Sequence, residues 1–183
     1  MANAKYEFVP GDEITIAPGR TVKRIRALVA ISYFASAGSL GGYIESEKSL
    51  EVYGDAWVYG NAQVYGDARV YGNAQVYGDA WVYGNARVYG NAQVYGNAQV
   101  YGNAQVYGDG LIVWFSHVGS ENGTLTVYNT KDNTLEVTRG CFRGTVDEFL
   151  AASEKKHDDQ THLEYRLLIE VAHSRITRSR GAV

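Results

Sequence analysis

Two arginines of this chain occupy equivalent places in a repeat and could bind an anion together. Arg69 and Arg87 lie eighteen residues apart, and each is followed by Val-Tyr. Two guanidinium groups beside aromatic rings can hold a phosphate and stack on a planar ring, so the pattern is compatible with a shallow anion or nucleotide site. The alternative is a solvated ladder in which Glu51 pairs with Arg69, a contact that contributes little to stability.

The same repeat is expected to place many aromatic side chains on the surface. Ten tyrosines follow the ten repeat valines, and a tryptophan precedes two of these valines. Aromatic rings stacked in register stabilise a ladder of strands by themselves, but a large aromatic surface is also typical of an interface. The candidate ligand or partner surface comprises Tyr53, Trp57, Tyr59, Arg69, Tyr71, Trp81, Tyr83, Arg87 and Tyr89.

Catalytic side chains are scarce near this surface. An acyltransferase, the alternative function, needs a histidine base in or beside a coil, whereas His117, His157, His162 and His173 all lie outside the repeats. His117 follows the last repeat and is the candidate base, with a structural role as the alternative. Asp147 and Glu148 could act as a carboxylate pair, but their place in the first turn of a predicted helix favours capping. We therefore predict no catalytic residue, no metal site and no cofactor.

The element that would position the arginines and tyrosines is a six-residue repeat, V-Y-G-[DN]-A-x, from Val52 to Leu111. A strict period of six predicts a parallel β-solenoid, in which each unit supplies one short strand and one corner. Alternation along the strand points valine and alanine inward, and tyrosine and the variable residue outward. Glycine and Asn/Asp are expected at the corner because they tolerate positive φ.

Units of this kind resemble the hexapeptide-repeat, left-handed β-helix family, which implies three units per triangular coil. Eighteen residues would then stack on the next eighteen. The frame extends upstream to Leu40, with Leu50 in the small position, and predicts four coils over residues 40–111. One outer face would stack Glu51, Arg69, Arg87 and Gln105. The aromatic faces favour a homo-oligomer, and the family analogy favours a trimer.

Residues 1–39 and 112–183 are expected to cap the two ends of the rod, which would otherwise expose strand edges. The first cap is predicted to be a β-hairpin that turns at Pro18-Gly19. Val22, Arg24 and Arg26 should share one side of its second strand. The basic residues Lys23, Arg24 and Arg26 would protect an edge strand or, alternatively, contact an acidic partner.

The second cap is predicted to contain three strands and two helices, and thus to be α+β. Capping boxes at Thr145–Glu148 and Thr161–Glu164 open the helices, which should end near Lys156 and Ile176. The basic tail RITRSRGAV, from Arg175 to Val183, is expected to be frayed. The apolar face of the second helix is predicted to comprise Leu163, Leu167, Ile169, Val171 and Ala172, with Tyr165 at its edge.

The composition of the chain argues against several classes of function. A net charge of −3 provides no basic field for nucleic acid, and a single cysteine, Cys141, excludes an internal disulfide framework. A DNA mimic would need rows of carboxylates, but the corners carry only Asp55, Asp67, Asp79 and Asp109 against six asparagines. No segment has the length of a membrane span or the pattern of a signal peptide, so we expect no membrane contact and a cytoplasmic location.

Three motifs together resemble a group of phage and prophage proteins: the opening GGYIE, the YGNA-type coils and the closing GCFRGTVDEF. The similarity spans about Lys23 to Ile176. It implies a mainly β protein with a left-handed β-helix between two caps. It also implies a non-catalytic binding protein in the host cytoplasm, of the kind that acts as an anti-defence factor by blocking a host immune protein or sequestering a nucleotide signal.

Overall fold

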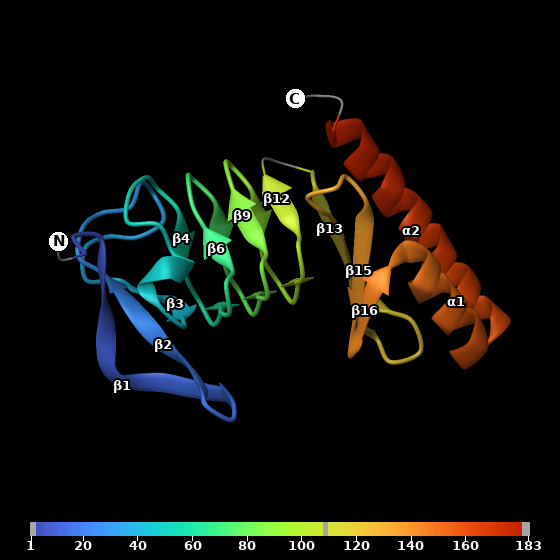
Figure 1. The fold of residues 1–183 in the computed structure, drawn as a ribbon, viewed down its shortest axis with the longest axis horizontal. Helices are drawn as coiled ribbons and strands as arrows, with labels where there is room; N and C mark the ends of the chain where they lie inside the picture. The colour runs from blue at the N-terminus through green and yellow to red at the C-terminus, as the bar shows by residue number, and fades with distance from the viewer. Residues whose placement is uncertain (1–2, 108–109, 181–183) are drawn as a thin grey trace.

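A computed structural model describes residues 3–107 and 110–180 of the chain. The elements form three parts in a row (Figure 1): an N-terminal β-hairpin, a central solenoid, and a C-terminal cap of four strands and two helices. The predicted fold class, a mainly β solenoid with a β cap before it and an α+β cap after it, is confirmed.

The solenoid is built from short parallel strands, one in each six-residue unit. From β4 onward each strand pairs with the strand eighteen residues further along, as Val76 does with Val94. Three stacks result, in the orders β3-β5-β8-β11, β4-β7-β10 and β6-β9-β12. The strands are β3 (Leu40–Ile44), β4 (Trp57–Val58), β5 (Gln63–Val64), β6 (Arg69–Val70), β7 (Gln75–Val76), β8 (Trp81–Val82), β9 (Arg87–Tyr89), β10 (Gln93–Val94), β11 (Gln99–Val100) and β12 (Gln105–Tyr107).

Valine and alanine fill the interior of the solenoid, as the alternation predicts. Val76 and Ala74 are fully buried, and so are their equivalents in the neighbouring coils. Burying one valine side chain contributes about 1.5–3 kcal/mol, and the stack repeats this gain in every unit. The outward positions are therefore free to vary without loss of the core.

Glycine alone provides the positive φ at the corners, which corrects the prediction that Asn and Asp share this role. Gly72 has a φ of 69°, whereas no corner Asn or Asp in the described part of the chain has a positive φ. A Cβ atom on Gly72 would lie 3.1 Å from the amide nitrogen of Gly90 in the next coil, so a side chain would be strained there. The polar corner residues instead bond across coils: Asn73 Nδ2 donates to Asn91 Oδ1 at 3.2 Å.

The first coil is two residues longer than the others, and this corrects the predicted upstream frame. Ile44 pairs with Val64, and Leu50 pairs with Val70, so both partners are twenty residues apart. Leu50 therefore occupies a valine position and not the small position. The two additional residues lie between Leu50 and β4. As a result Val52 is only half-buried and does not take part in a strand.

The N-terminal hairpin continues the first sheet of the solenoid. Its strands β1 (Tyr6–Ala17) and β2 (Arg20–Ala27) are antiparallel, as predicted, and β2 also pairs with β3. Ile25 and Ala27 are buried in the core of the solenoid, and Val22 is also fully buried. The extra residue of the register irregularity between Arg24 and Arg26 lies in β3, so it does not disturb the alternation along β2.

The basic residues of β2 do not lie on an edge strand, because β1 and β3 flank it on both sides. The Arg24 guanidinium donates to the carbonyl oxygens of Gly41 and Gly60, at 2.9 and 2.8 Å. It also donates to Tyr43 Oη at 2.7 Å and forms an ion pair with Asp12 at 3.2 Å. Arg24 thus holds the hairpin on the first coils, and its predicted edge role is wrong.

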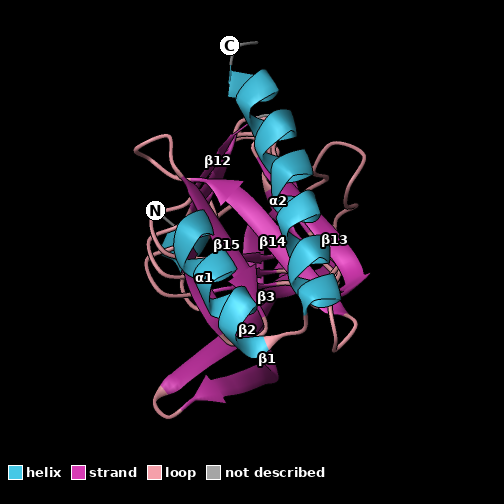
Figure 2. Ribbon diagram, turned by 90° about the vertical axis from the view of Figure 1, so that its right-hand side faces the viewer, coloured by secondary structure: helices cyan, strands magenta, loops and turns pink. Residues whose placement is uncertain are grey.

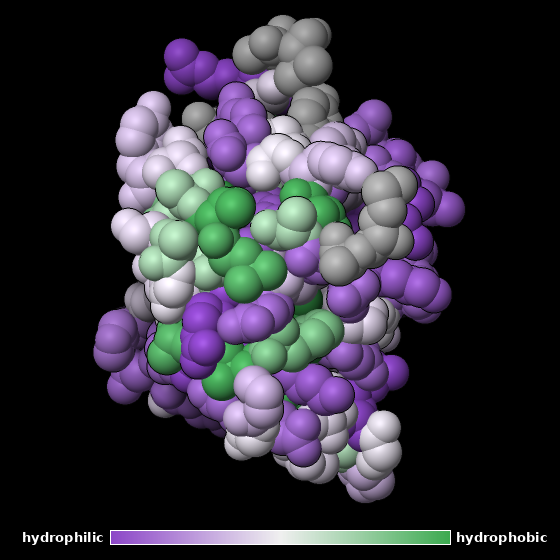
Figure 3. All heavy atoms as spheres, turned by 90° about the vertical axis from the view of Figure 1, so that its left-hand side faces the viewer, coloured by the Kyte–Doolittle hydropathy of each residue, from purple (hydrophilic) through white to green (hydrophobic). Residues whose placement is uncertain are grey.

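The outer end of this cap carries exposed apolar side chains (Figure 3). Leu28 and Val29 are 43% and 47% exposed, and Tyr33 is 96% exposed. These residues follow β2, beside Ile31 and Ala35, which belong to the buried core of the solenoid. The segment therefore covers the first coil while its own outer surface stays apolar.

The C-terminal cap is a four-stranded antiparallel sheet with two helices across one face (Figure 2). Its strands are β13 (Ile112–Val118), β14 (Gly123–Asn129), β15 (Leu135–Arg139) and β16 (Phe142–Thr145). The predicted three strands omit β16, which is short and follows β15 after a tight turn. Ile112 lies eighteen residues after Val94 and is buried in the solenoid core, so β13 joins the two parts.

Helices α1 (Val146–Lys156) and α2 (Asp159–Arg180) confirm one capping box and correct the other. Thr145 and Glu148 bond reciprocally at the start of α1. At α2 the side chain of Asp158 accepts from the Thr161 amide at 2.7 Å, so the helix begins before the predicted box. The helix also runs to Arg180, beyond the predicted end at Ile176. Two parts of the predictions lie outside the described residues: residues 181–183 of the tail, and the corner residue Asp109.

The buried face of α2 differs from the predicted one. Tyr165, Ile169, Ala172 and Ile176 are buried against the sheet, whereas Leu163, Leu167 and Val171 are 42%, 50% and 48% exposed. The three exposed residues follow one another at intervals of four along one side of the helix. No helix in the described ranges is long and apolar enough to cross a membrane.

Candidate functional site

A groove lies on the face of the solenoid that carries the stack of β6, β9 and β12. It is formed by β6, by the start of β9, and by the short 3-10 helix η1 (Glu47–Ser49) with the segment that follows it. Its volume is about 490 Å³. We call it the arginine groove, and it is lined by Glu47, Lys48, Leu50, Glu51, Val52, Tyr53, Arg69, Val70, Tyr71 and Arg87.

Three cationic side chains line the arginine groove. Arg69 and Arg87 are register partners on the parallel strands β6 and β9, and Lys48 approaches from η1. All three side chains are exposed. Among the residues that the structure describes, none of the three forms an ion pair. The groove therefore presents positive charge that no carboxylate neutralises through direct contact.

Two tyrosines give the groove aromatic surfaces. The ring of Tyr71 stacks on that of Tyr89 with centroids 4.8 Å apart and planes 4° from parallel. Tyr53 comes from the enlarged first coil and is 77% exposed. The tyrosines that the sequence assigns to this face therefore do lie beside the arginines, although Tyr53 does not stack in the ladder.

Glu51 does not pair with Arg69, which corrects that alternative. Because the first coil is longer, the amide of Glu51 donates to the carbonyl oxygen of Val70, and Glu51 Oε2 accepts from the amide of Gly72 at 2.8 Å. The carboxylate is thus held at the corner of the coil. This leaves both guanidinium groups available to a ligand.

The enlarged first coil is what makes this face concave. Elsewhere each unit stacks directly on the next, but here the segment after Leu50 diverges from the stack and carries Val52 and Tyr53 outward. The same register change brings Lys48 next to the arginines. The sequence analysis did not predict Lys48 as a residue of this groove. The break in the six-residue repeat between Leu50 and Trp57 was the only sign in the sequence of the longer first coil that places Lys48 there.

The groove has the chemistry to hold an anion that carries a planar ring. Guanidinium groups bind phosphate through paired donors, and they stack on rings. Tyrosine faces stack on aromatic bases in the same way. A volume of about 490 Å³ lies within the range of small-molecule sites, roughly 300–1,000 Å³.

Other residues of the predicted surface lie elsewhere, and some are not on the surface. Trp57 is fully buried, because it packs beneath the N-terminal cap with its ring centroid 6.4 Å from that of Tyr6. Tyr83 is 5% exposed and lies in a ladder with Tyr65 and Tyr101. Burial raises the pKa of Tyr83 to about 12. Their predicted place on an exposed surface is therefore wrong.

Trp81 and Tyr59 are partly exposed and so agree better with the predicted surface. Trp81 is 39% exposed and sits in register between Gln63 and Gln99 on the first sheet. Tyr59 is half-buried, and its ring stacks on that of Tyr77 at 4.8 Å. Neither residue lines the arginine groove, so the predicted set is divided among all three faces.

The candidate catalytic residues do not assemble into a recognisable site. His117 lies in the irregular part of β13 with a φ of 58°, in a shallow pocket with Asn122 and Arg139. Glu148 caps α1 through Thr145, as predicted. Within the described residues, no group of three or more His, Cys, Asp or Glu side chains could hold a metal ion.

Comparison with known families identifies the repeat. Residues 62–78, 74–90, 80–96 and 92–108 each match the model of the YdcK beta solenoid repeat. The comparison with curated proteins finds no match. The matched residues span the coils of β5 to β12, where the structure has its strict eighteen-residue register. The chain is therefore a repeat β-helix protein with a cap at each end.

Proposed function

We propose that this is a non-catalytic binding protein that holds a phosphorylated, ring-bearing ligand such as a nucleotide in the arginine groove. The observation that carries the proposal is the cluster of Lys48, Arg69 and Arg87 beside Tyr53 and Tyr71. Glu47 and Glu51 also line the groove, but the three cations outnumber these two carboxylates and none of the three forms an ion pair with them, so the groove favours an anion. A nucleotide supplies both the anion and the ring.

The biological setting follows from the motif resemblance. A protein of phage or prophage origin that retains a nucleotide could deprive a host defence system of its signal, and the proposed role is thus an anti-defence factor in the host cytoplasm. A rod that binds a host immune protein through the same face is the competing version. We further propose a homo-oligomer, with a trimer favoured, because the exposed apolar end of the N-terminal cap and the tyrosine ladders offer surface for self-contact.

Calorimetric titration of the purified protein with mono- and dinucleotides tests the proposal. Wild type is compared with the double variant Arg69→Gln/Arg87→Gln and with Arg178→Gln, a control that removes an exposed arginine far along α2. A hydrogen bond to a charged group contributes about 1.5–3 kcal/mol. The double variant should therefore lose at least ~100-fold in affinity, and the control should lose none.

Two further measurements, the salt dependence of the affinity and competition by inorganic phosphate, complete the test. Because the contacts are ionic, affinity should fall as salt rises, and inorganic phosphate should compete. If no nucleotide or phosphate binds, or if the double variant binds as well as wild type, the nucleotide proposal is wrong. A host protein that binds wild type but not the double variant would support the competing version instead.

A further inference from the structure

The strand β13 is an open edge of the cap sheet. The strand order is β13-β14-β15-β16, so β13 has a partner on one side only. Every second N–H and C=O group of an edge strand points away from its sheet and can pair with another strand. In the described part of the chain, no backbone group outside β14 bonds to Ile112–Phe115.

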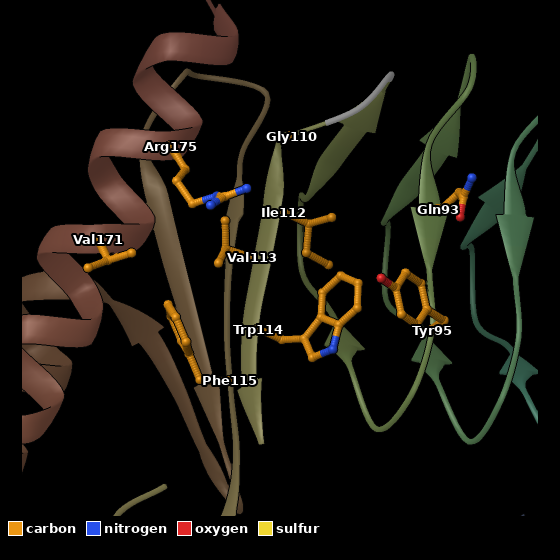
Figure 4. Close-up of a pocket in the computed structure, with 9 residues that line it drawn as sticks. All are labelled: Gln93, Tyr95, Gly110, Ile112, Val113, Trp114, Phe115, Val171 and Arg175. Atoms are coloured by element: carbon orange, nitrogen blue, oxygen red, sulfur yellow. The ribbon is translucent and has the colours of Figure 1, made fainter. Parts of the chain in front are cut away.

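A slot of about 550 Å³ runs along this edge (Figure 4). We call it the β13 slot, and it is lined by Gln93, Tyr95, Gly110, Ile112, Val113, Trp114, Phe115, Val171 and Arg175. One wall is the last coil, where Tyr95 meets Trp114 edge-on with ring centroids 4.3 Å apart. The other wall is α2, which contributes Val171 and Arg175.

The side chains of β13 alternate between the two walls. Ile112 packs into the core of the solenoid and Trp114 against it, whereas Val113 and Phe115 pack against the core of the cap. An added strand would follow the same alternation, so its odd and even side chains would meet different walls, each of which combines apolar and polar side chains. The slot thus offers backbone partners and two sets of side-chain contacts together.

We infer that the β13 slot binds an extended peptide segment of a partner protein, which adds to the sheet as a strand beside β13. The segment has apolar side chains at alternate positions and a carboxylate that pairs with Arg175. Strand addition of this kind derives affinity from main-chain hydrogen bonds and specificity from the pockets for alternate side chains. The guanidinium of Arg175 is exposed and forms no ion pair with a described residue, so it is available.

Two observations favour an isolated segment over a second copy of the chain. The slot has a wall on each side, and a single strand occupies only about 4.8 Å beyond the edge. A second copy that paired through its own β13 would also bring its own α2 and coils against these walls. It would bring a second Arg175 as well, and like charges would face each other. A peptide carboxylate, by contrast, complements the arginine.

The probe is a labelled heptapeptide of alternating valine and threonine with a glutamate at one end, in both orientations. Binding is measured by fluorescence anisotropy, and hydrogen exchange reports the amides of β13. Two N-methylated versions each block one alternating set of amides, and only the set that faces β13 should matter. Arg175→Gln should weaken binding about 10-fold, as expected for loss of one charged contact. Arg178→Gln is the matched control.

The expected result is saturable binding, with slower exchange at residues 112–115 and abolition by one N-methylated set alone. Three results would overturn the inference: no binding of either orientation, equal binding of both N-methylated peptides, or binding that leaves exchange in β13 unchanged. Protection of these amides that rises with protein concentration in the absence of peptide would mean that a second copy covers the edge, which also contradicts it.

Discussion

Arg69 and Arg87 are direct register partners on adjacent parallel strands. In the other two stacks, glutamine or tryptophan takes this position from β4 and β5 onward, and Gln105 follows Arg87 in the same stack. Like charges at neighbouring cross-strand positions destabilise a sheet. The arginine pair is therefore a local cost to the solenoid, and such a cost is typical of residues that serve a ligand.

This relationship predicts that Arg87→Gln stabilises the free protein. Removing the repulsion should add about 0.5 kcal/mol, which corresponds to a rise in Tm of about 1–2 °C for a chain of this size. Differential scanning calorimetry without ligand measures it. The same variant should show weaker nucleotide binding. A lower Tm for Arg87→Gln would show that the arginine stabilises the fold and does not serve a ligand.

Trp57 and Trp81 occupy equivalent places in their units but should respond very differently to truncation. Trp57 is fully buried, whereas Trp81 is 39% exposed. Trp57→Ala should cost about 3–5 kcal/mol because it leaves a large cavity, and Trp81→Ala should cost about 1 kcal/mol or less. Urea unfolding followed by far-UV circular dichroism provides both values. Equal costs would contradict the packing of the N-terminal cap.

The strict repeat made the central part of the fold predictable. An aliphatic residue at every sixth position can be buried in only one way. The strands, the corners and the eighteen-residue register between Val58 and Val106 could therefore all be predicted from the repeat. The stacking of Arg69 on Arg87 follows from the same count. Local capping rules placed the start of α1 correctly for a similar reason, because Thr145 and Glu148 bond within one turn.

The first coil could not be predicted because its sequence fits two frames. Leu40 and Leu50 suit the six-residue frame as a valine position and a small position. However, Leu40 is 54% exposed, and Ile44 and Leu50 both take valine positions. The choice depends on contacts with β2, which lie outside the repeat. The burial of Trp57 and the position of Lys48 both follow from the frame that the first coil adopts. The concave groove therefore could not be predicted from the local sequence.

Arg24 should be among the most sensitive residues of the N-terminal cap. Its guanidinium bonds two carbonyl oxygens and the hydroxyl of Tyr43, and it stacks 4.1 Å from the centroid of that ring. Arg24→Ala should lower the free energy of unfolding by about 3 kcal/mol. Arg24→Lys should recover little of it, because an ammonium group cannot donate in a planar fork. Full recovery with lysine in a urea titration would argue against this geometry.

Stability should rise with pH between about 8 and 9.5 because of Lys5. Burial lowers the pKa of Lys5 to about 8, whereas the unfolded chain keeps this proton to about pH 10.4. The unfolded state therefore binds more protons across this window, and stability increases as pH rises through it. Lys5→Met should abolish the increase in urea unfolding curves. Above about pH 10 the trend reverses, since burial raises the pKa of Tyr6 to about 12.

The proposed function depends most on what occupies the arginine groove, and native mass spectrometry of the protein purified from cells tests this directly. We expect whole copies of the chain, with a trimer predominant, each carrying the added mass of a nucleotide, and we expect Arg69→Gln/Arg87→Gln to lose that mass. Oligomers without added mass, or a nucleotide that the double variant retains, would show that the arginine groove does not hold a nucleotide.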